Sequence, residues 1–182
     1  MLYAICAVLC VGLVGLDQWV KWWTVVNIPY TVPMKEPLPF IPYILGLNHT
    51  RNTGAAFSMF SDNRWVFMVF SLIAMVLMTY LLVKFHGRHW LLSVSLAAVL
   101  GGGIGNMIDR VLCGYVVDFL DFQFMKFAVF NVADIFVTCG SVALAVYIIF
   151  IEPKVERRLQ EQKAAEAVPE EVPREGNDDG DQ

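Results

Sequence analysis

Two aspartates embedded in apolar residues are the strongest candidates for chemistry in this sequence. Asp118 lies in the block Val-Val-Asp-Phe, and Asp134 closes the block Phe-Asn-Val-Ala-Asp. Apolar surroundings raise the pKa of a carboxyl group, and two neighbouring carboxyls can share one proton. Such a pair can act as base toward a water and as acid toward an amide carbonyl, as in aspartic proteases.

The same two residues admit other roles. Asp134 stands where a helix is expected to begin, so it can be a capping residue. Acidic side chains near a bilayer can also form an ion path. Serine and cysteine nucleophiles are disfavoured, because no histidine accompanies a serine or cysteine in a recognisable motif. A catalytic pair, a cap and an ion path therefore stay open at this point.

Asp17 and Lys21 form a second polar pair. They lie four residues apart, so on a helix they share a face and can form an ion pair. A salt bridge that fastens the end of the helix explains them at least as well as direct chemistry does.

A third polar cluster follows a glycine-rich segment. Gly101 and Gly105 form a GxxxG pattern, which is typical of close packing between helices. Asn106, Asp109 and Arg110 follow at spacings of three and four residues, so they lie within one turn of each other. A helix thinned by glycine is thus expected to deliver these polar groups to one end of a bundle.

The chain that must position these residues is strongly apolar. Of its 182 residues 57% are hydrophobic, against about 45–50% in soluble domains. The mean hydropathy is +0.57. The net charge of −4 arises from residues 164–182, which hold seven acids and one base. Basic residues elsewhere are scattered between apolar blocks, so no nucleic-acid partner is expected.

The cysteines and histidines do not indicate a metal or cofactor. The four cysteines contain no CxxC pair, and none of the three histidines has a ligand-spaced Cys or His partner. We therefore expect a site without metal and without cofactor.

Four apolar blocks approach the length of about 20 helical residues that crosses a hydrocarbon core. They run from Met1 past Asp17 to the tryptophans at 19, 22 and 23, over Trp65–Val83, over Trp90–Ile108 and over Ile135–Ile151. The last is expected to end at Glu152-Pro153, because proline does not allow a simple continuation. The sequence therefore predicts an all-α integral membrane protein with four transmembrane helices.

The basic residues set the expected orientation. The short turn at residues 84–89 is basic, and Lys154, Arg157, Arg158 and Lys163 follow the last apolar block. The positive-inside rule makes both segments cytoplasmic. Both termini are then cytoplasmic, and the polar clusters lie at the outer face.

The remaining segments define the domain organisation. Residues 27–64 carry five prolines, which exclude a long helix. We expect strands at Tyr43–Thr50 and Ala55–Phe60 around a turn at 52–54, forming a small extracytoplasmic β element on the outer membrane surface. Residues 1–153 form the membrane domain. Residues 154–182 form a basic flank and an acidic tail, disordered from Ala164 onward.

In five blocks the sequence resembles the lipoprotein signal peptidase family, also called signal peptidase II. The blocks are Asp17-Gln18-x-x-Lys21, Asn52-Thr-Gly54-Ala-Ala-Phe57-Ser58, Gly101-Gly102-x-x-Gly105-Asn106-x-x-Asp109-Arg110, Val116-Val117-Asp118-Phe119 and Phe130-Asn131-x-Ala133-Asp134. They occur in order between residues 17 and 134.

The resemblance assigns roles to these residues. It implies that Asp118 and Asp134 are the catalytic pair. It makes Asp109 a supporting residue and places Asp17 and Lys21 at the edge of the site. The residues that it places along the substrate cleft are Asn52, Gly54, Asn106, Arg110, Asn131 and Ala133.

The resemblance also implies an activity. Members are bacterial enzymes of the cytoplasmic (inner) membrane that remove signal peptides from prolipoproteins, immediately before a diacylglyceryl-modified cysteine. The expected partners are that substrate and membrane lipid, and the expected state is a monomer. Two alternatives remain. The acids could serve as a relay in an ion-coupled transporter, although no internal repeat supports this. The GxxxG pattern could be a dimer interface in a non-enzymatic membrane protein.

Overall fold

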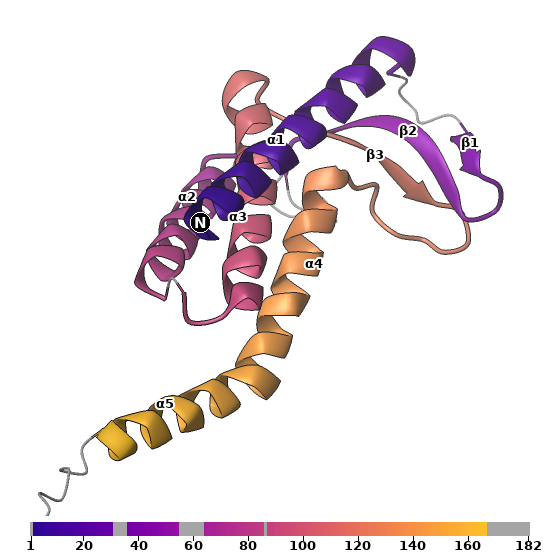
Figure 1. Cartoon of the computed structure of the whole chain (residues 1–182). Coiled ribbons are helices and arrows are strands. Elements are labelled where there is room, and N and C mark those ends of the chain that lie inside the picture. Colours follow the sequence, from indigo (N-terminus) through magenta and orange to yellow (C-terminus); the bar gives the residue numbers. More distant parts are fainter. Residues whose placement is uncertain (1, 31–35, 55–63, 86, 167–182) are drawn as a thin grey trace, which may run out of the picture.

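The computed structural model of the chain describes residues 2–30, 36–54, 64–85 and 87–166. Its elements are α1 (Leu2–Asn27), β1 (Leu38–Ile41), β2 (Leu45–Asn52), α2 (Arg64–Lys84), α3 (Trp90–Leu112), β3 (Val116–Phe122), α4 (Val132–Val146), the π-helical turn η2 (Tyr147–Ile151) and α5 (Glu152–Glu166). The described chain is mostly helical, with a three-stranded sheet at one end of the helices (Figure 1).

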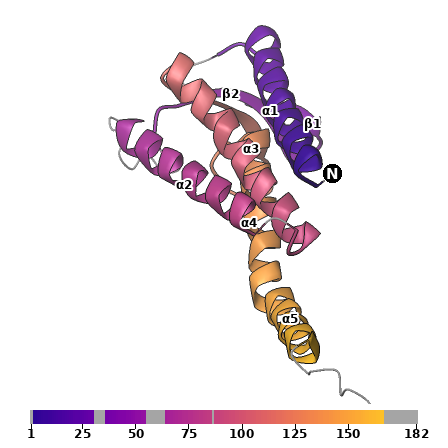
Figure 2. The same ribbon diagram turned by 60° about the vertical axis from the view of Figure 1, so that its left-hand side comes forward.

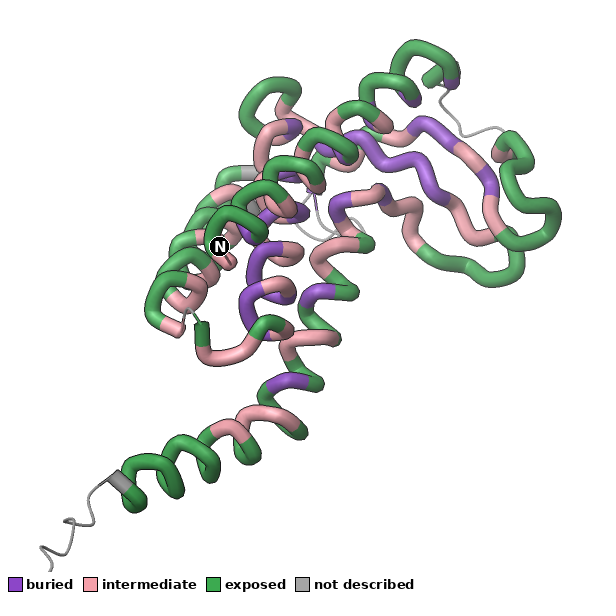
Figure 3. The backbone as a smooth tube through the Cα atoms, viewed as in Figure 1, coloured by how far each residue is buried: buried purple, intermediate pink, exposed green. Residues whose placement is uncertain are grey.

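Helix α3 is the centre of the bundle. Half of the most apolar stretch of α3 is buried inside the protein. The corresponding share is 11% in α1 and 11% in the continuous helix that starts with α4. Figure 2 shows α3 between α1 and α2, and Figure 3 shows buried residues following α3 and the strands β2 and β3. An apolar helix with little buried surface faces lipid, so α1 and α4 present most of their surface to the membrane.

Two glycines of α3 allow close packing against another helix of the same chain. A Cβ atom on Gly101 would lie 3.2 Å from Leu13 Cβ, and one on Gly105 would lie 2.5 Å from Asp17 Oδ2. Both neighbours belong to α1. The GxxxG pattern therefore packs α3 against α1 of the same chain.

The predicted helices are present, but the number of membrane crossings is supported only in part. By length and composition, α1, α3 and the continuous helix Val132–Ala165 can each cross a membrane. The apolar part of α2, Met68–Lys84, is shorter. The chain is therefore a helical membrane protein, and a fourth crossing by α2 stays a prediction.

The two ends of the bundle differ in content. Tyr3 Oη donates to the carbonyl oxygen of Val83 at 3.4 Å, and Arg88 pairs with Glu152 at 2.5 Å. The start of α1, the α2–α3 turn and the start of α5 therefore share one end. The sheet, the end of α3 and the start of α4 lie at the other end (Figure 1).

The prediction that the last membrane helix ends at Glu152-Pro153 was wrong. The helix runs through η2 into α5 and reaches Glu166, with α5 leaving at an angle to α4 (Figure 1). The N–H of Glu152 donates to Tyr147 O, five residues earlier. In a regular α-helix the ring of Pro153 would clash with the carbonyl of Ile149, four residues earlier. The π-helical turn replaces the α-helical hydrogen-bond pattern just before Pro153 and so avoids this clash. The predicted disorder was also wrong for residues 164–166, and residues 167–182 lie outside the described chain.

The sheet differs from the predicted β element. The predicted strand Tyr43–Thr50 overlaps β2, whereas the predicted strand Ala55–Phe60 lies outside the described residues. The strand order is β1-β2-β3, both pairs are antiparallel, and Thr50 is paired with Asp118. Strand β1 contains Pro39 and lies at the edge, where proline costs no ladder hydrogen bond. Because β3 follows β2 only after two helices, their pairing had no local signal.

Candidate active site

Asp118 and Asp134 are brought into one polar site by two asparagine side chains. Asn131 Nδ2 donates to Asp118 Oδ1 at 2.6 Å and to Asn106 Oδ1 at 3.0 Å. Asn106 Nδ2 in turn donates to Asp134 Oδ1 at 2.8 Å. The two carboxyls thus lie at opposite ends of one chain of amide hydrogen bonds, contributed by β3, α3 and the start of α4.

Asp134 also takes part in a helix cap, in which Asn131 is the N-cap residue and Asp134 the third residue of the helix, so the predicted capping role is found in that form. Its Oδ2 accepts from the backbone N–H of Asn131 at 3.1 Å, and Asn131 Oδ1 accepts from the N–H of Asp134 at 3.0 Å. This is a reciprocal capping box at the start of α4. One carboxylate oxygen is held by the cap and the other faces Asn106, so the cap fixes the orientation of the acid.

Asp118 is the more deeply buried acid. Its side chain accepts from Asn52 Nδ2 at 2.9 Å, and Asn52 Oδ1 is held by the N–H of Gly54 at 3.1 Å. Burial raises the pKa of Asp118 to about 6, and the nearby charge of Asp134 acts in the same direction. The hydrogen bonds from Asn52 and Asn131 lower it. A carboxyl with this pKa can hold or release a proton near neutral pH, as acid–base chemistry requires.

A buried lysine contacts the residues around the two acids. Lys21 Nζ lies 2.8 Å from Asp17 Oδ2 and 3.0 Å from Asp109 Oδ2, and it donates to Asn106 Oδ1 at 2.9 Å. Lys21 is 3% exposed and Asp17 is 1% exposed. The predicted salt bridge therefore exists, and it is buried between helices.

The two partners of Lys21 each hold the residue that precedes a candidate catalytic aspartate. Asp17 Oδ1 accepts from the N–H of Ala133 at 2.9 Å. Asp109 Oδ2 accepts from the N–H of Val117 at 3.1 Å. One cation thus fixes two anions, and these fix the backbone next to Asp134 and Asp118.

Gln18 belongs to the same network and was given no role by the sequence. Its Nε2 donates to Asp109 Oδ1 at 2.9 Å and to the carbonyl oxygen of Gly105 at 3.0 Å. The available signal was its position inside the first of the five motif blocks, between Asp17 and Lys21.

A cavity of about 250 Å³ opens beside Asp134, between α2, α3 and α4. Its lining is Ser71, Ala74, Met75, Met78, Val99, Leu100, Gly103, Asn106, Arg110, Asp134 and Val137. Arg110 also donates to the carbonyl oxygen of Asn106 at 3.3 Å. The cavity is therefore apolar over most of its wall and polar where Asn106, Arg110 and Asp134 line it.

Two of the residues predicted to line the substrate cleft are fully buried. Asn131 and Ala133 are both 0% exposed, so neither forms an open wall of the cavity. Ala133 packs against Gly105, whose added Cβ would lie 3.5 Å from the Ala133 Cβ. In the described part of the chain, no three His, Cys, Asp or Glu side chains gather as a metal site would require. The expectation of a site free of metal stays a prediction.

Comparisons with known proteins agree with this architecture. Residues 9–150 match the family described as Signal peptidase (SPase) II. A lipoprotein signal peptidase from Enterococcus faecalis is 46% identical over 140 residues, covering 77% of this chain and 84% of the relative. One from Clostridioides difficile is 37% identical over 158 residues, covering 85% and 99%.

Two solved structures of bacterial membrane enzymes have the same fold. One has a TM-score of 0.69 at 26% identity, covering 81% of this chain and 94% of the solved chain. The other has a TM-score of 0.68 at 25% identity, covering 93% and 94%. The resemblance carried by the five motif blocks is thereby confirmed, and the chain belongs to the signal peptidase II family.

Proposed function

We propose that this chain removes signal peptides from prolipoproteins by an aspartic mechanism in which Asp118 and Asp134 are the acid and the base. Membership of the signal peptidase II family supports the substrate class. One observation carries the mechanism: the two carboxyls end a single chain of amide hydrogen bonds through Asn131 and Asn106. Two acids held at one site, one of them with a pKa near 6, can exist with one proton between them.

The proposed reaction needs only these two carboxyls and a water. The ionised carboxyl takes a proton from water while the water oxygen attacks the carbonyl carbon of the scissile amide. The protonated carboxyl gives its proton to the carbonyl oxygen. In the second step this proton returns, the C–N bond breaks, and the leaving nitrogen takes up the proton first removed from water. Arg110 lies close enough to both acids to stabilise their negative charge.

The cavity beside Asp134 suits a lipid-modified substrate. Its apolar wall of residues from α2, α3 and α4 offers a place for aliphatic groups, while Asp134 lies at its polar end. We place the cut immediately before the diacylglyceryl-modified cysteine. There, the lipid and the signal helix can both enter from the bilayer while the scissile amide stays at the polar rim.

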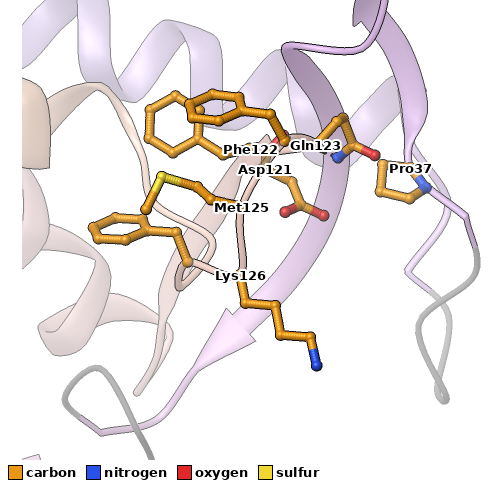
Figure 4. A pocket seen from close by; sticks show the side chains of 8 residues that line it. Pro37, Asp121, Phe122, Gln123, Met125 and Lys126 are labelled. Carbon is orange, nitrogen blue, oxygen red and sulfur yellow. Dashed lines mark hydrogen bonds between the residues drawn. The ribbon is translucent and has the colours of Figure 1, made fainter.

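The sheet is proposed to lie on the outer membrane surface. The loop after β3 exposes Phe124, Met125 and Phe127, at 63%, 47% and 51%, and Lys126 extends away from the aromatic rings (Figure 4). Exposed aromatic residues beside a lysine suit the boundary between lipid and water. Trp19 and Trp22 on α1 are also exposed, at 60% and 61%. In this arrangement all four long helices cross the bilayer, both termini are cytoplasmic, and the protein acts as a monomer.

The decisive experiment is cleavage of a diacylglyceryl-modified precursor by the purified protein in detergent. Asp118→Asn and Asp134→Asn are each expected to abolish cleavage while leaving thermal unfolding close to that of the wild type. Asp121→Asn is the matched control, because Asp121 lies on the same strand but lines a different pocket. Full activity of either Asp118→Asn or Asp134→Asn would contradict the mechanism, as would loss of activity on addition of a chelator.

A further inference from the structure

Gly103 differs from the other glycines of α3. A Cβ added to Gly101 or Gly105 would come within 3.2 Å or 2.5 Å of α1, and one on Gly102 would collide with the carbonyl of Ala133. A Cβ on Gly103 would meet only Met75 among the described residues, at 3.5 Å from Cγ and 3.9 Å from Sδ. These are ordinary van der Waals distances, so helix packing does not require glycine at position 103.

Glycine in the interior of a helix destabilises that helix relative to alanine. A helix glycine that packing does not require therefore calls for another explanation. Gly103 lies on the wall of the cavity of about 250 Å³, which also contains Asn106 and Asp134. Asn106 is one turn further along α3, and Asp134 lies at the polar end. The missing side chain therefore leaves free volume in the same cavity that Asp134 lines, on the side of Met75.

We propose that Gly103, with Met75 opposite, is a specificity-determining residue that sets the size of the aliphatic group accepted next to the scissile bond. The inference rests on the proposed active site, because the cavity is assigned to substrate through Asp134. The wall around Gly103 is apolar, formed by side chains such as Ala74, Val99 and Val137. It therefore selects an aliphatic group, either a side chain of the signal peptide or an acyl chain of the diacylglyceryl group.

The test compares wild type, Gly103→Ala and Gly103→Val on two series of precursors. One series varies the residue before the modified cysteine between alanine and leucine, with the lipid held constant. The other varies the acyl chains between short and long, with the peptide held constant. In one series, kcat/KM of Gly103→Val for the larger substrate is expected to fall about tenfold more than for the smaller, with a smaller difference for Gly103→Ala. The series that shows this selectivity identifies the aliphatic group.

Two further variants separate a size effect from damage to the fold. Gly12→Val is the matched control, because a Cβ on Gly12 in α1 would meet nothing within 4 Å, and it should leave selectivity unchanged. Met75→Ala, combined with Gly103→Val, should restore cleavage of the larger substrate by returning the volume that valine fills.

Equal loss of kcat/KM on all four substrates, no loss on any, or failure of Met75→Ala to restore selectivity would overturn the proposal. Cleavage by the wild type and by Asp134→Asn distinguishes failure of the catalytic mechanism from failure of the Gly103 proposal. If Asp134→Asn cleaves normally, the mechanism has failed, whereas a change of selectivity in an enzyme that still needs Asp134 concerns Gly103 alone.

Discussion

At the scale of single residues, the site depends on polar side chains that each bind at least two partners. Asn131 holds Asp118 and Asn106 with one amide nitrogen, and its carbonyl oxygen caps α4. Asp134 divides its two oxygens between that cap and Asn106. Because Asn131 and Asp134 each bind two partners, the orientation of both acids is fixed before substrate binds.

The pH dependence of cleavage should report the environment of Asp118. With one proton shared by the pair, activity is expected to fall as pH rises through the pKa of Asp118, about 6. Asn52 donates to the ionised form and so lowers this pKa. Asn52→Ala removes that donor, so the pKa rises and the alkaline limb of kcat/KM should move upward by about one pH unit.

The control for this prediction is Thr50→Val. Thr50 Oγ1 donates to the backbone carbonyl of Asp118 at 3.1 Å and not to its carboxyl, so the limb should stay in place. A downward movement of the limb in Asn52→Ala would show that Asn52 does not stabilise the carboxylate.

Lys21 is predicted to be essential for stability. Lys21→Met would leave the buried carboxylates of Asp17 and Asp109 without their cation. Breaking a buried ion pair in this way costs about 3–5 kcal/mol. Unfolding in detergent, followed by heat or denaturant, should show a loss of this size, whereas the exposed Lys126→Met should unfold like the wild type. A Lys21→Met protein of unchanged stability would show that the network is not what holds these helices.

At the scale of elements, close approach of helices positions the two acids. Glycines of α3 admit α1 on one side and the start of α4 on the other. This brings Asp17 to Ala133 and Lys21 to Asn106. Strand β3 is fixed to the end of α3 by Asp109. Three helices and one strand must therefore pack correctly before the acids share a site.

Gly105→Ala tests this packing. Its Cβ would lie 2.5 Å from Asp17 Oδ2, and Asp17 cannot retreat without losing Lys21 and Ala133. We expect a loss of about 1–3 kcal/mol in unfolding free energy, with a parallel loss of activity. Gly12→Ala makes the same chemical change on α1 where nothing lies within 4 Å, and it should be neutral or slightly stabilising. Equal effects of the two substitutions would refute the packing argument.

At the scale of the whole molecule, the two ends of the helix bundle carry different groups. The acids, the buried lysine and the sheet lie together at one end, whereas Arg88, Glu152 and the charged α5 lie at the other. This division agrees with the proposed orientation, in which substrate meets the site at the outer face and the basic flanks stay in the cytoplasm.

Cysteine labelling can test that orientation. Cys113 is an exposed free thiol at the end of α3, next to the sheet. In a variant that keeps Cys113 as its only cysteine, a membrane-impermeant thiol reagent should label intact cells. A second variant with its only cysteine at Arg157→Cys, exposed on α5, should be labelled only after the membrane is opened. The reverse pattern would invert the proposed topology.

The sequence by itself determined the apolar helices, the family and the identity of the important polar residues. Hydrophobic length and motif spacing are local properties, so α1, α2 and α3 appeared close to their predicted bounds. The local proline rule failed at Pro153, where a π-helical turn let the helix continue. Sequence patterns also could not reveal that Thr50 pairs with Asp118, because this strand pairing joins residues 68 positions apart.

Only the tertiary structure decided which partners each of the four aspartates has. In the sequence, Asp17, Asp109, Asp118 and Asp134 all carry the same cost of placing an acid near a membrane. In the fold, Asp17 and Asp109 are paired with Lys21, while Asp118 and Asp134 are joined through neutral amides. The pairing with Lys21 offsets the cost of burying the charges of Asp17 and Asp109. That difference depends on distances across helices, which no spacing along the chain encodes.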